Sequence, residues 1–370
     1  MPHFHDTTPE AWRNPGFVAF LFARLAGMFA TQIQAMVVVW QVYEFTRSPM
    51  ALAWVGLAQF LPMLLLLMPA GELIDRASRK LILMASWGVA MLCSLTLAWL
   101  TSHGSTGVNG IYVTLVLFGC SRAFSGPALQ SLLPQIVPRV QLAHALATNG
   151  MVMRAASIGG PIIGGMLYAR GGGEWTYAVC ALSFFAAAFL LHWVKTHHAE
   201  TRAAKDTDER NVWRRFGAGI GFIFRRPIIF GSISLDLFAV LLGGVVALLP
   251  IYAVEILHTD AEGLGWLRAA IAIGEVGAGV VLSLHPFNRA VGRSLFVAVA
   301  IFGLANLVFS LSHWFWLSLT ALMVAGAADM VSVYIRGALV QFATPDDMRG
   351  RVNAVTMLFI GSSNELGEFR

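Results

Sequence analysis

Long apolar runs alternate with short polar stretches along the whole chain. Each run is about the length that crosses a bilayer core, which takes roughly 20 helical residues for ~30 Å. The runs are continuous rather than alternating, so they predict helices, whose backbone hydrogen bonds close within the segment. The clearest break is a charged island, residues 71–80, between runs that end near Ala70 and begin at Leu81. We expect this island to be a tight loop at one membrane face.

One long polar segment divides the runs into two sets. Residues 195–227 mix Lys, Arg, Asp and Glu and contain no run that could span a membrane, so they are predicted to be a cytoplasmic linker. The flanking regions, residues 1–194 and 228–370, are predicted to be the two halves of the protein. The predicted spans are 16–45, 50–70, 81–100, 111–133, 142–168 and 175–194, then 228–254, 264–284, 294–311 and 314–342.

An internal repeat relates the two halves. The island Asp75-Arg76-Ala77-Ser78-Arg79 returns in degraded form as residues 288–293, after the eighth span. Two six-helix halves of equal orientation are related by an axis along the membrane normal. The fold class is therefore all-α, a polytopic membrane protein in parallel repeat. An eleventh span begins at Val352 and the sequence stops within it at Arg370, which we interpret as either a fragment or a truncated product.

Composition supports the same class. The chain is 57% hydrophobic and only 12% charged, whereas about a quarter of the residues in a soluble domain are charged. The net charge of +5 is dispersed over short loops, which argues against a nucleic-acid partner. Cys93, Cys120 and Cys180 lie inside apolar runs and are expected to be buried small hydrophobes. No motif of an enzyme, a cofactor site or a metal site is recognised.

Basic residues predict the orientation. Lys and Arg gather in alternate loops, including the island and the linker, whereas the other loops hold only Arg47 and Arg170. Positive loops stay cytoplasmic, so the N-terminus and the island are predicted to be cytoplasmic. Residues 1–14 lack the pattern of a cleavable signal, so the first span is expected to remain in the membrane.

The island carries a resemblance. Gly71-x-x-x-Asp75-Arg76-x-Ser78-Arg79-Lys80 resembles the signature loop between the second and third helices of the major facilitator superfamily, with Ser78 where the family prefers glycine. The resemblance implies two six-helix halves and transport by alternating access in the inner membrane of a bacterium. It also implies a gating loop that latches the cytoplasmic side, formed by Gly71, Asp75, Arg76, Arg79 and Lys80.

Two further motifs fall in the matching spans. Residues 122–126 resemble the Arg-x-x-Gln-Gly motif of the superfamily, in which the arginine is associated with proton coupling; Ser125 replaces the glutamine. Residues 159–165 are similar to the Gly-Pro-x-x-Gly-Gly motif of its antiporters, and small residues let helices approach closely. Residues 31–43 and 125–130 resemble the branch that contains enterobactin exporters and drug–proton antiporters. The predicted helix seam consists of Gly160, Pro161, Gly164 and Gly165.

Ionisable residues inside the apolar runs indicate a function independently of any resemblance. An ionised side chain at the bilayer centre costs about 2.5–3.5 kcal/mol, so it should face the bundle interior or a cavity. The first half carries arginines and the second carboxylates, and a low dielectric favours the neutral carboxyl that a proton carrier needs. Structural ion pairing or a hydrogen bond between helices is the alternative for each. The predicted proton-coupling residues are Arg122, Asp236, Glu275 and Asp329.

Polar residues of the first half complete the hypothesis. Arg24, Gln32, Gln34 and Arg154 are predicted to line the substrate cavity, with bonding between helices or snorkelling as the alternative. The predicted protein is a monomeric transporter in the lipid bilayer that exports a small organic molecule, siderophore or drug-like, in exchange for protons. A proton-coupled importer and a non-transporting sensor or scaffold on the same fold remain the alternatives.

Overall fold

The computed structural model describes residues 14–103, 107–194, 220–285 and 291–345, with Val352 and Thr356 as single positions. Regular structure within these ranges is helical throughout, which confirms the all-α prediction. Eight of the described helices are long and apolar enough to cross a membrane. The chain is therefore a multi-pass membrane protein. Of the predicted linker, 195–227, residues 195–219 lie outside the described residues, whereas residues 220–225 are helical and α7 begins at Pro227. Nearly all of the predicted eleventh span also lies outside the described residues.

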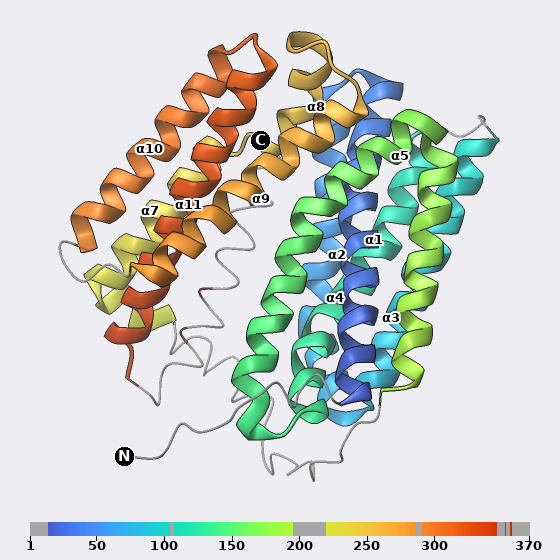
Figure 1. Cartoon of the computed structure of the whole chain (residues 1–370), viewed down its shortest axis with the longest axis horizontal. Coiled ribbons are helices and arrows are strands. Elements are labelled where there is room, and N and C mark those ends of the chain that lie inside the picture. Colours follow the sequence, from blue (N-terminus) through green and yellow to red (C-terminus); the bar gives the residue numbers. More distant parts are fainter. Residues whose placement is uncertain are drawn as a thin grey trace. The chain divides into compact units, whose positions relative to one another are not determined.

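The chain forms two compact units (Figure 1). Unit 1 comprises Met1–Thr201 and Thr259–Gly265, and unit 2 comprises Arg202–His258 and Trp266–Arg370. Unit 1 contains α1 (Pro15–Thr46), α2 (Pro49–Arg76), α3 (Arg79–Ser102), α4 (Asn109–Ile136), the short η2 (Arg139–Gln141) and α5 (Leu142–His192). Unit 2 contains α7 (Pro227–Gly243), η3 (Val246–Leu248), α8 (Leu249–Ile251), η4 (Tyr252–Ile256), most of α9 (Ala261–Leu284), α10 (Val291–Leu311) and α11 (Phe315–Ala343).

The start and end of α1 follow from local chemistry. The Asn14 side chain accepts hydrogen bonds from the backbone N–H groups of Gly16 and Phe17, at 2.9 and 3.4 Å. Pro15 occupies the first helical position, where no N–H is needed. The helix ends at Arg47, whose φ of 49° is left-handed. Its N–H still donates to the Tyr43 carbonyl, so the turn closes without an orphaned donor.

The island is not the loop that the sequence predicted. α2 continues through Arg76, so only Ala77 and Ser78 separate it from α3. Glu72 and Arg76 form an ion pair of 2.5 Å one helical turn apart, which favours helix over loop. Ser78 then caps α3 by accepting from the Leu81 N–H. The island therefore adds a final turn to α2 and leaves a connection of minimal length.

The predicted boundaries after residue 142 fare differently. The fifth and sixth predicted spans are both present as the two parts of α5, which meet at Gly172, with φ 68° and ψ −174° (Figure 1). Such a conformation is open to glycine and strained for other residues. The seventh predicted span is interrupted: α7 ends at Gly243, and Gly244 leads into a 3₁₀ turn, a short α segment and a π-helical turn. Glycine and Pro250 weaken continuous helix here.

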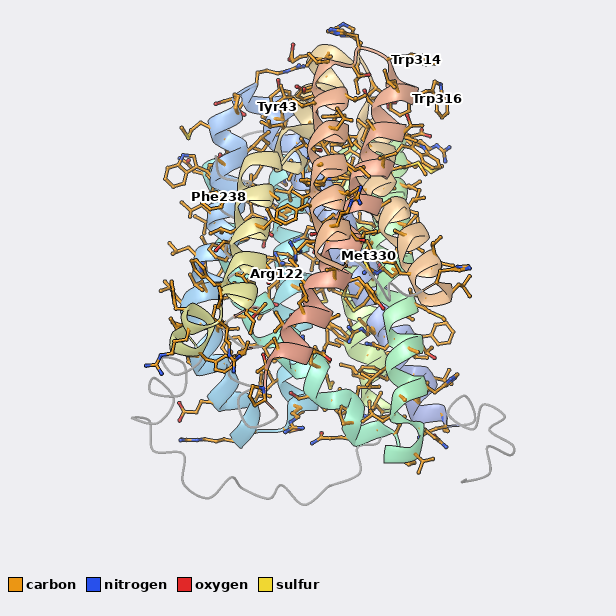
Figure 2. The ribbon with its side chains drawn as sticks, turned by 90° about the vertical axis from the view of Figure 1, so that its left-hand side faces the viewer. Tyr43, Arg122, Phe238, Trp314, Trp316 and Met330 are labelled. Carbon is orange, nitrogen blue, oxygen red and sulfur yellow. The ribbon has the colours of Figure 1, made fainter. Side chains whose placement is uncertain are left out.

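Each unit has its own helix packing. In unit 1, α1 packs on α5, α2 on α4, and α3 on both α4 and α5. Its largest wholly buried side chains include Phe17, Phe20, Met36, Tyr177 and Phe184. In unit 2, α10 packs along α11, and α7 contacts both. Trp314 and Trp316 are exposed at the end of unit 2 where α10 turns into α11 (Figure 2), as residues of an interfacial aromatic belt are.

Candidate transport site

The cations of the signature loop bind the ends of neighbouring helices. Arg79 Nη1 donates to the Ser131 carbonyl in the last turns of α4, at 3.0 Å. Lys80 Nζ donates to the carbonyls of His192 and Val194 at the end of α5, both at 2.9 Å. The carbonyls of His192 and Val194 lie at and beyond the end of α5, where carbonyls lack partners within the helix and attract cations. The loop therefore ties the start of α3 to α4 and α5 within unit 1.

The other loop residues contribute differently. Arg76 pairs with Glu72 of its own helix, and both side chains are largely exposed. A Cβ on Gly71 would meet open space, so nothing packs closely there. The side chain of Asp75, the residue to which the sequence assigns the latch, lies outside the described residues.

The predicted seam meets two helices. A Cβ on Gly160 would press on the Gln32 side chain of α1, and one on Gly164 would lie 3.3 Å from Ile33 Cα. On the other side, a Cβ on Gly165 would run into the Ala261 carbonyl, in the first turn of α9. The contact is reciprocal, since a Cβ on Gly265 would run into the Pro161 carbonyl. Within unit 1, α5 and the start of α9 thus cross backbone against backbone, which only small residues permit.

A buried polar stripe runs along α1 toward α3. Ser94 donates to Gln34 Oε1 at 2.6 Å. One heptad later, Gln41 donates to Thr101 at 2.9 Å and accepts from the Tyr177 O–H at 2.8 Å. Gln41 therefore joins α1, α3 and the second part of α5, and Gln34 and Gln41 are each 1% exposed. Gln41 was not predicted as a site residue, although its spacing of seven from Gln34 places both on one helix face.

Arg24 lies further along the same helix, buried and with an unsatisfied Nε among the described residues. It precedes by one turn Gly27, whose missing side chain leaves room for the Trp87 ring of α3. Arg24 is 6% exposed, and its Nε has no hydrogen-bond partner among the described residues. A buried guanidinium without a counter-charge is costly, so this position calls for an anion or for water.

The predicted cavity residues do not share one surface. Gln32 contacts Gly160 of α5, whereas Gln34 is bonded to α3. Arg154 is exposed on α5. Arg122 is half-buried in α4 (Figure 2). The arginines of unit 1 therefore range from buried to exposed, and the two glutamines face different neighbours.

In unit 2, two of the predicted carboxylates flank a close helix crossing. A Cβ on Gly274 of α9 would strike the Met323 carbonyl, and one on Gly326 of α11 would strike the Ile271 carbonyl. A Cβ on Gly279 would lie 3.5 Å from Met330 (Figure 2). The residue numbers of these contacts increase together on both helices, so α9 and α11 run parallel. This pairing of glycines was not predicted.

Two predicted carboxylates lie close to this crossing along the helix axes. Glu275 follows Gly274 directly and Asp329 precedes Met330, so both half-buried side chains lie near the crossing level of α9 and α11. Arg336 is buried further along α11, at 7% exposure. The side chain of Asp236 on α7 lies outside the described residues. No group of three His, Cys, Asp or Glu that could hold a metal ion occurs in the part of the chain that the structure describes.

Comparison with known proteins identifies the class. Residues 8–368 match the family described as transmembrane secretion effector, of the major facilitator superfamily. The enterobactin exporter EntS of Citrobacter koseri is 27% identical over 349 residues, which cover 92% of this chain and 81% of that protein. The enterobactin exporter of Escherichia coli O1:K1 is 26% identical over the same shares.

Solved structures agree on the fold. A bacterial homologue of the human lysosomal transporter Spinster, inward-facing and unoccupied, has a TM-score of 0.73 at 14% identity and covers 98% of this chain and 82% of that one. An inward-facing bacterial homologue of the iron transporter ferroportin has a TM-score of 0.70 at 16% identity, with 95% and 90% covered. The chain belongs to the transmembrane secretion effector family of the major facilitator superfamily. It is a membrane transporter of small molecules and not an enzyme.

Proposed function

We propose that this protein exports a small organic molecule of the siderophore or drug-like class across a bacterial inner membrane in exchange for protons. The observation that carries the proposal is its similarity to enterobactin exporters over 92% of the chain. The protein acts as a monomer with its N-terminus in the cytoplasm. The asymmetric distribution of Lys and Arg among the loops supports this orientation.

The crossing of α5 with the start of α9 is the proposed moving seam. Alternating access requires helices that pack closely in one state and separate in the other. Gly160, Pro161, Gly164 and Gly165 form the α5 side, and the reciprocal contacts of Gly165 and Gly265 support this role. Asp260 stabilises the α9 side by accepting from the Gly263 N–H at 3.0 Å, which fixes the first turn.

Proton coupling is assigned to the carboxylates of unit 2 together with Arg122. Glu275 and Asp329 both lie beside the α9–α11 crossing, which supports assigning them together. Asp236 on α7 is the third proposed carboxylate. Arg24, Gln32, Gln34 and Arg154 remain the proposed cargo residues. Of these, Arg24 has the strongest physical reason to receive an anionic group, because it is buried without a partner among the described residues.

The gating loop is the proposed cytoplasmic latch. Arg79 and Lys80 hold the ends of α4 and α5, which supports a loop that moves as part of unit 1. Gly71, Asp75 and Arg76 complete the set. In this proposal Asp75 makes the contact that forms and breaks during the cycle, while the cations keep the loop in place.

Transport in inside-out vesicles tests the proposal. We expect these vesicles to take up a catecholate siderophore or a drug-like dye. The uptake should require a vesicle interior more acidic than the medium, and a protonophore should stop it. Glu275→Gln should lower the gradient-driven rate at least about tenfold, while Glu174→Gln, an exposed control on α5, should not. Uptake only into right-side-out vesicles would indicate an importer. Absence of transport of any tested cargo in either orientation would favour a sensor or scaffold.

A matched glycine pair tests the seam. Gly165→Ala should slow transport because its Cβ runs into the Ala261 carbonyl. Gly150→Ala, on the same helix α5, is the control, since a Cβ there meets nothing within 4 Å. Equal transport rates for the two variants would contradict a role for this crossing in the cycle.

A further inference from the structure

A short helix precedes α7 in unit 2. Residues 220–225 are helical, and Arg226 is extended, with φ −112° and ψ 95°, as a residue before proline usually is. α7 begins directly afterwards at Pro227. We call residues 220–230, which cover the short helix and the first turn of α7, the entry segment. Its two faces differ in what they contact.

The inner face of the entry segment is buried in unit 2. Ile223 is 5% exposed and belongs to a hydrophobic cluster. The other buried members come from α7, from α11 and from the chain after α11, and they are Ile229, Ile233, Val340 and Val352. Ile220, one turn before Ile223, packs against the same cluster. The short helix is therefore held against the start of α7 and the end of α11.

The outer face carries an exposed pair of aromatic rings. Gly221, Phe224 and Arg225 are three and four residues apart, which places them on one side of the short helix, and all three are exposed. Phe224 is 61% exposed, and its ring centroid lies 4.9 Å from that of Phe230, which is 42% exposed. Exposed aromatic rings beside basic residues are typical of segments that lie in the boundary between lipid and water.

Two adjacent cations lie beside these rings. Arg225 and Arg226 are both exposed, and the Arg226 guanidinium lies 5.6 Å from the centroid of the Phe222 ring, a cation–π contact that positions it. Among the described residues, neither arginine forms an ion pair. The sequence offers no carboxylate nearby, because residues 210–235 contain five arginines and no Asp or Glu. Neighbouring like charges repel, so an anion from outside the chain would stabilise this pair.

We propose that Arg225 and Arg226 bind the phosphate of an anionic phospholipid, with Phe224 and Phe230 against its glycerol and upper acyl region. Guanidinium groups bind phosphate oxygens with paired hydrogen bonds, and basic clusters next to a membrane-spanning helix attract anionic lipids. The exposed rings favour a lipid over a soluble phosphate, because a soluble phosphate has no apolar part to cover them. The proposed orientation of the protein places this lipid in the cytoplasmic leaflet, whereas the site itself does not depend on it.

The bound lipid also stabilises unit 2. Ile223, on the inner face of the short helix, packs in the same cluster as Ile229 of α7 and Val340 of α11. A lipid that holds the outer face in place therefore holds the inner face on the ends of both helices. Because a ligand that binds only the folded state raises the unfolding midpoint, lipid binding has a readout in stability as well as in occupancy.

Lipid binding by the purified full chain in detergent tests the proposal. Native mass spectrometry counts the lipids retained from an equimolar mixture of phosphatidylglycerol and phosphatidylcholine with the same acyl chains. Heat unfolding with either lipid added measures the stabilisation. The test variant is Arg225→Gln/Arg226→Gln. The control is Arg170→Gln/Arg293→Gln, which removes the same charge at two other exposed arginines.

We expect the wild type and the control to retain phosphatidylglycerol over phosphatidylcholine by at least about fivefold, and Arg225→Gln/Arg226→Gln to lose this preference. Arg225→Lys/Arg226→Lys keeps the charge and should keep part of the preference. Phe224→Ala should lower the retention of both lipids without changing their ratio, because the ring contacts no charged group of the lipid. Phosphatidylglycerol should raise the unfolding midpoint of the wild type and not that of the double Gln variant.

Several outcomes would overturn the proposal. An equal ratio of the two lipids on the wild type would do so, as would the same loss of preference in the control, because the attraction would then come from the overall charge. Inorganic phosphate or glycerol phosphate that stabilises the wild type as much as phosphatidylglycerol would replace the lipid with a soluble ligand. Heat unfolding without lipid shows whether each variant is folded. If the double Gln variant does not fold, Arg225→Gln alone should give a ratio between those of the wild type and an even mixture, and an unchanged ratio would contradict the site.

Discussion

The two units hold their helices together by different means. In unit 1, Gln34 and Gln41 of α1 make buried hydrogen bonds to α3 and α5. In unit 2, α9 and α11 meet at Gly274 and Gly326, where each backbone touches the other. Side-chain hydrogen bonds fix the rotation of a helix about its axis, whereas glycine contacts fix the distance between axes. The repeat therefore preserves the helix order while the stabilising chemistry has diverged.

Charge diverges at a corresponding position. Counted from the proline that opens each first helix, Arg24 in α1 and Asp236 in α7 occupy the same place. One unit thus presents a cation where the other presents a carboxyl group. A transporter built from two similar halves gains unlike binding surfaces from such substitutions without changing its fold.

The largest expected effect is in unit 2. Gly326→Ala drives a Cβ into the Ile271 carbonyl, which should lower the free energy of unfolding by about 3 kcal/mol, since backbone contacts cannot relax as side chains do. Gly277→Ala is the matched control, because a Cβ there is unopposed and alanine favours helix by about 1 kcal/mol. Heat unfolding in detergent, followed by circular dichroism, should give shifts of opposite sign. A similar shift for both would show that the crossing is loose.

In unit 1 the corresponding test removes hydrogen bonds. Gln41→Leu strands the Tyr177 hydroxyl and the Thr101 oxygen, and should cost about 2 kcal/mol, because buried bonds between helices average about 0.6 kcal/mol and unsatisfied groups add to the loss. Gln130→Leu, at an exposed position on α4, should change the unfolding midpoint little. If Gln41→Leu unfolds like the wild type, the stripe does not stabilise unit 1.

The sequence predicted the helices better than it predicted their contacts. Apolar runs located α1, α3 and α4 closely because membrane length alone determines them. The island was wrongly expected to be a loop, because α2 continues through Arg76 and only Ala77 and Ser78 connect it to α3. The break after Gly243 was also missed, although Gly243, Gly244 and Pro250 were visible as helix-weakening residues.

Candidate residues show the same limit. The glycines of residues 159–165 were selected by motif, yet their partners Ala261 and Gly265 lie far along the chain and only folding brings them near. Gln32 and Gln34 looked alike as polar residues in one span, but a separation of two places them on different sides of a helix. Hydrophobicity gives the position of a span, and the direction of a side chain depends on packing between helices.

A smaller effect is expected at the signature loop. Lys80→Met removes the cation from the carbonyls of His192 and Val194 and should cost about 1 kcal/mol, typical of a charge at a helix C-terminus. Lys80→Arg retains the charge and should recover most of the loss. Amide hydrogen exchange at the end of α5 should accelerate in Lys80→Met alone. Unchanged exchange there would mean that the two hydrogen bonds do not hold the helix end.

The smallest effect concerns the pair next to it. Arg76 and Glu72 are joined at 2.5 Å, but their side chains are 76% and 50% exposed. Water screens such a pair, so Arg76→Met should change the free energy of unfolding by no more than about 0.5 kcal/mol. Chemical denaturation of this variant and of Lys80→Met compares what the two cations of one motif contribute to the free energy of unfolding. If Arg76→Met lowered the free energy of unfolding more than Lys80→Met does, Arg76 would have a buried partner in the working protein. The loop would then stabilise contacts other than those at the ends of α4 and α5.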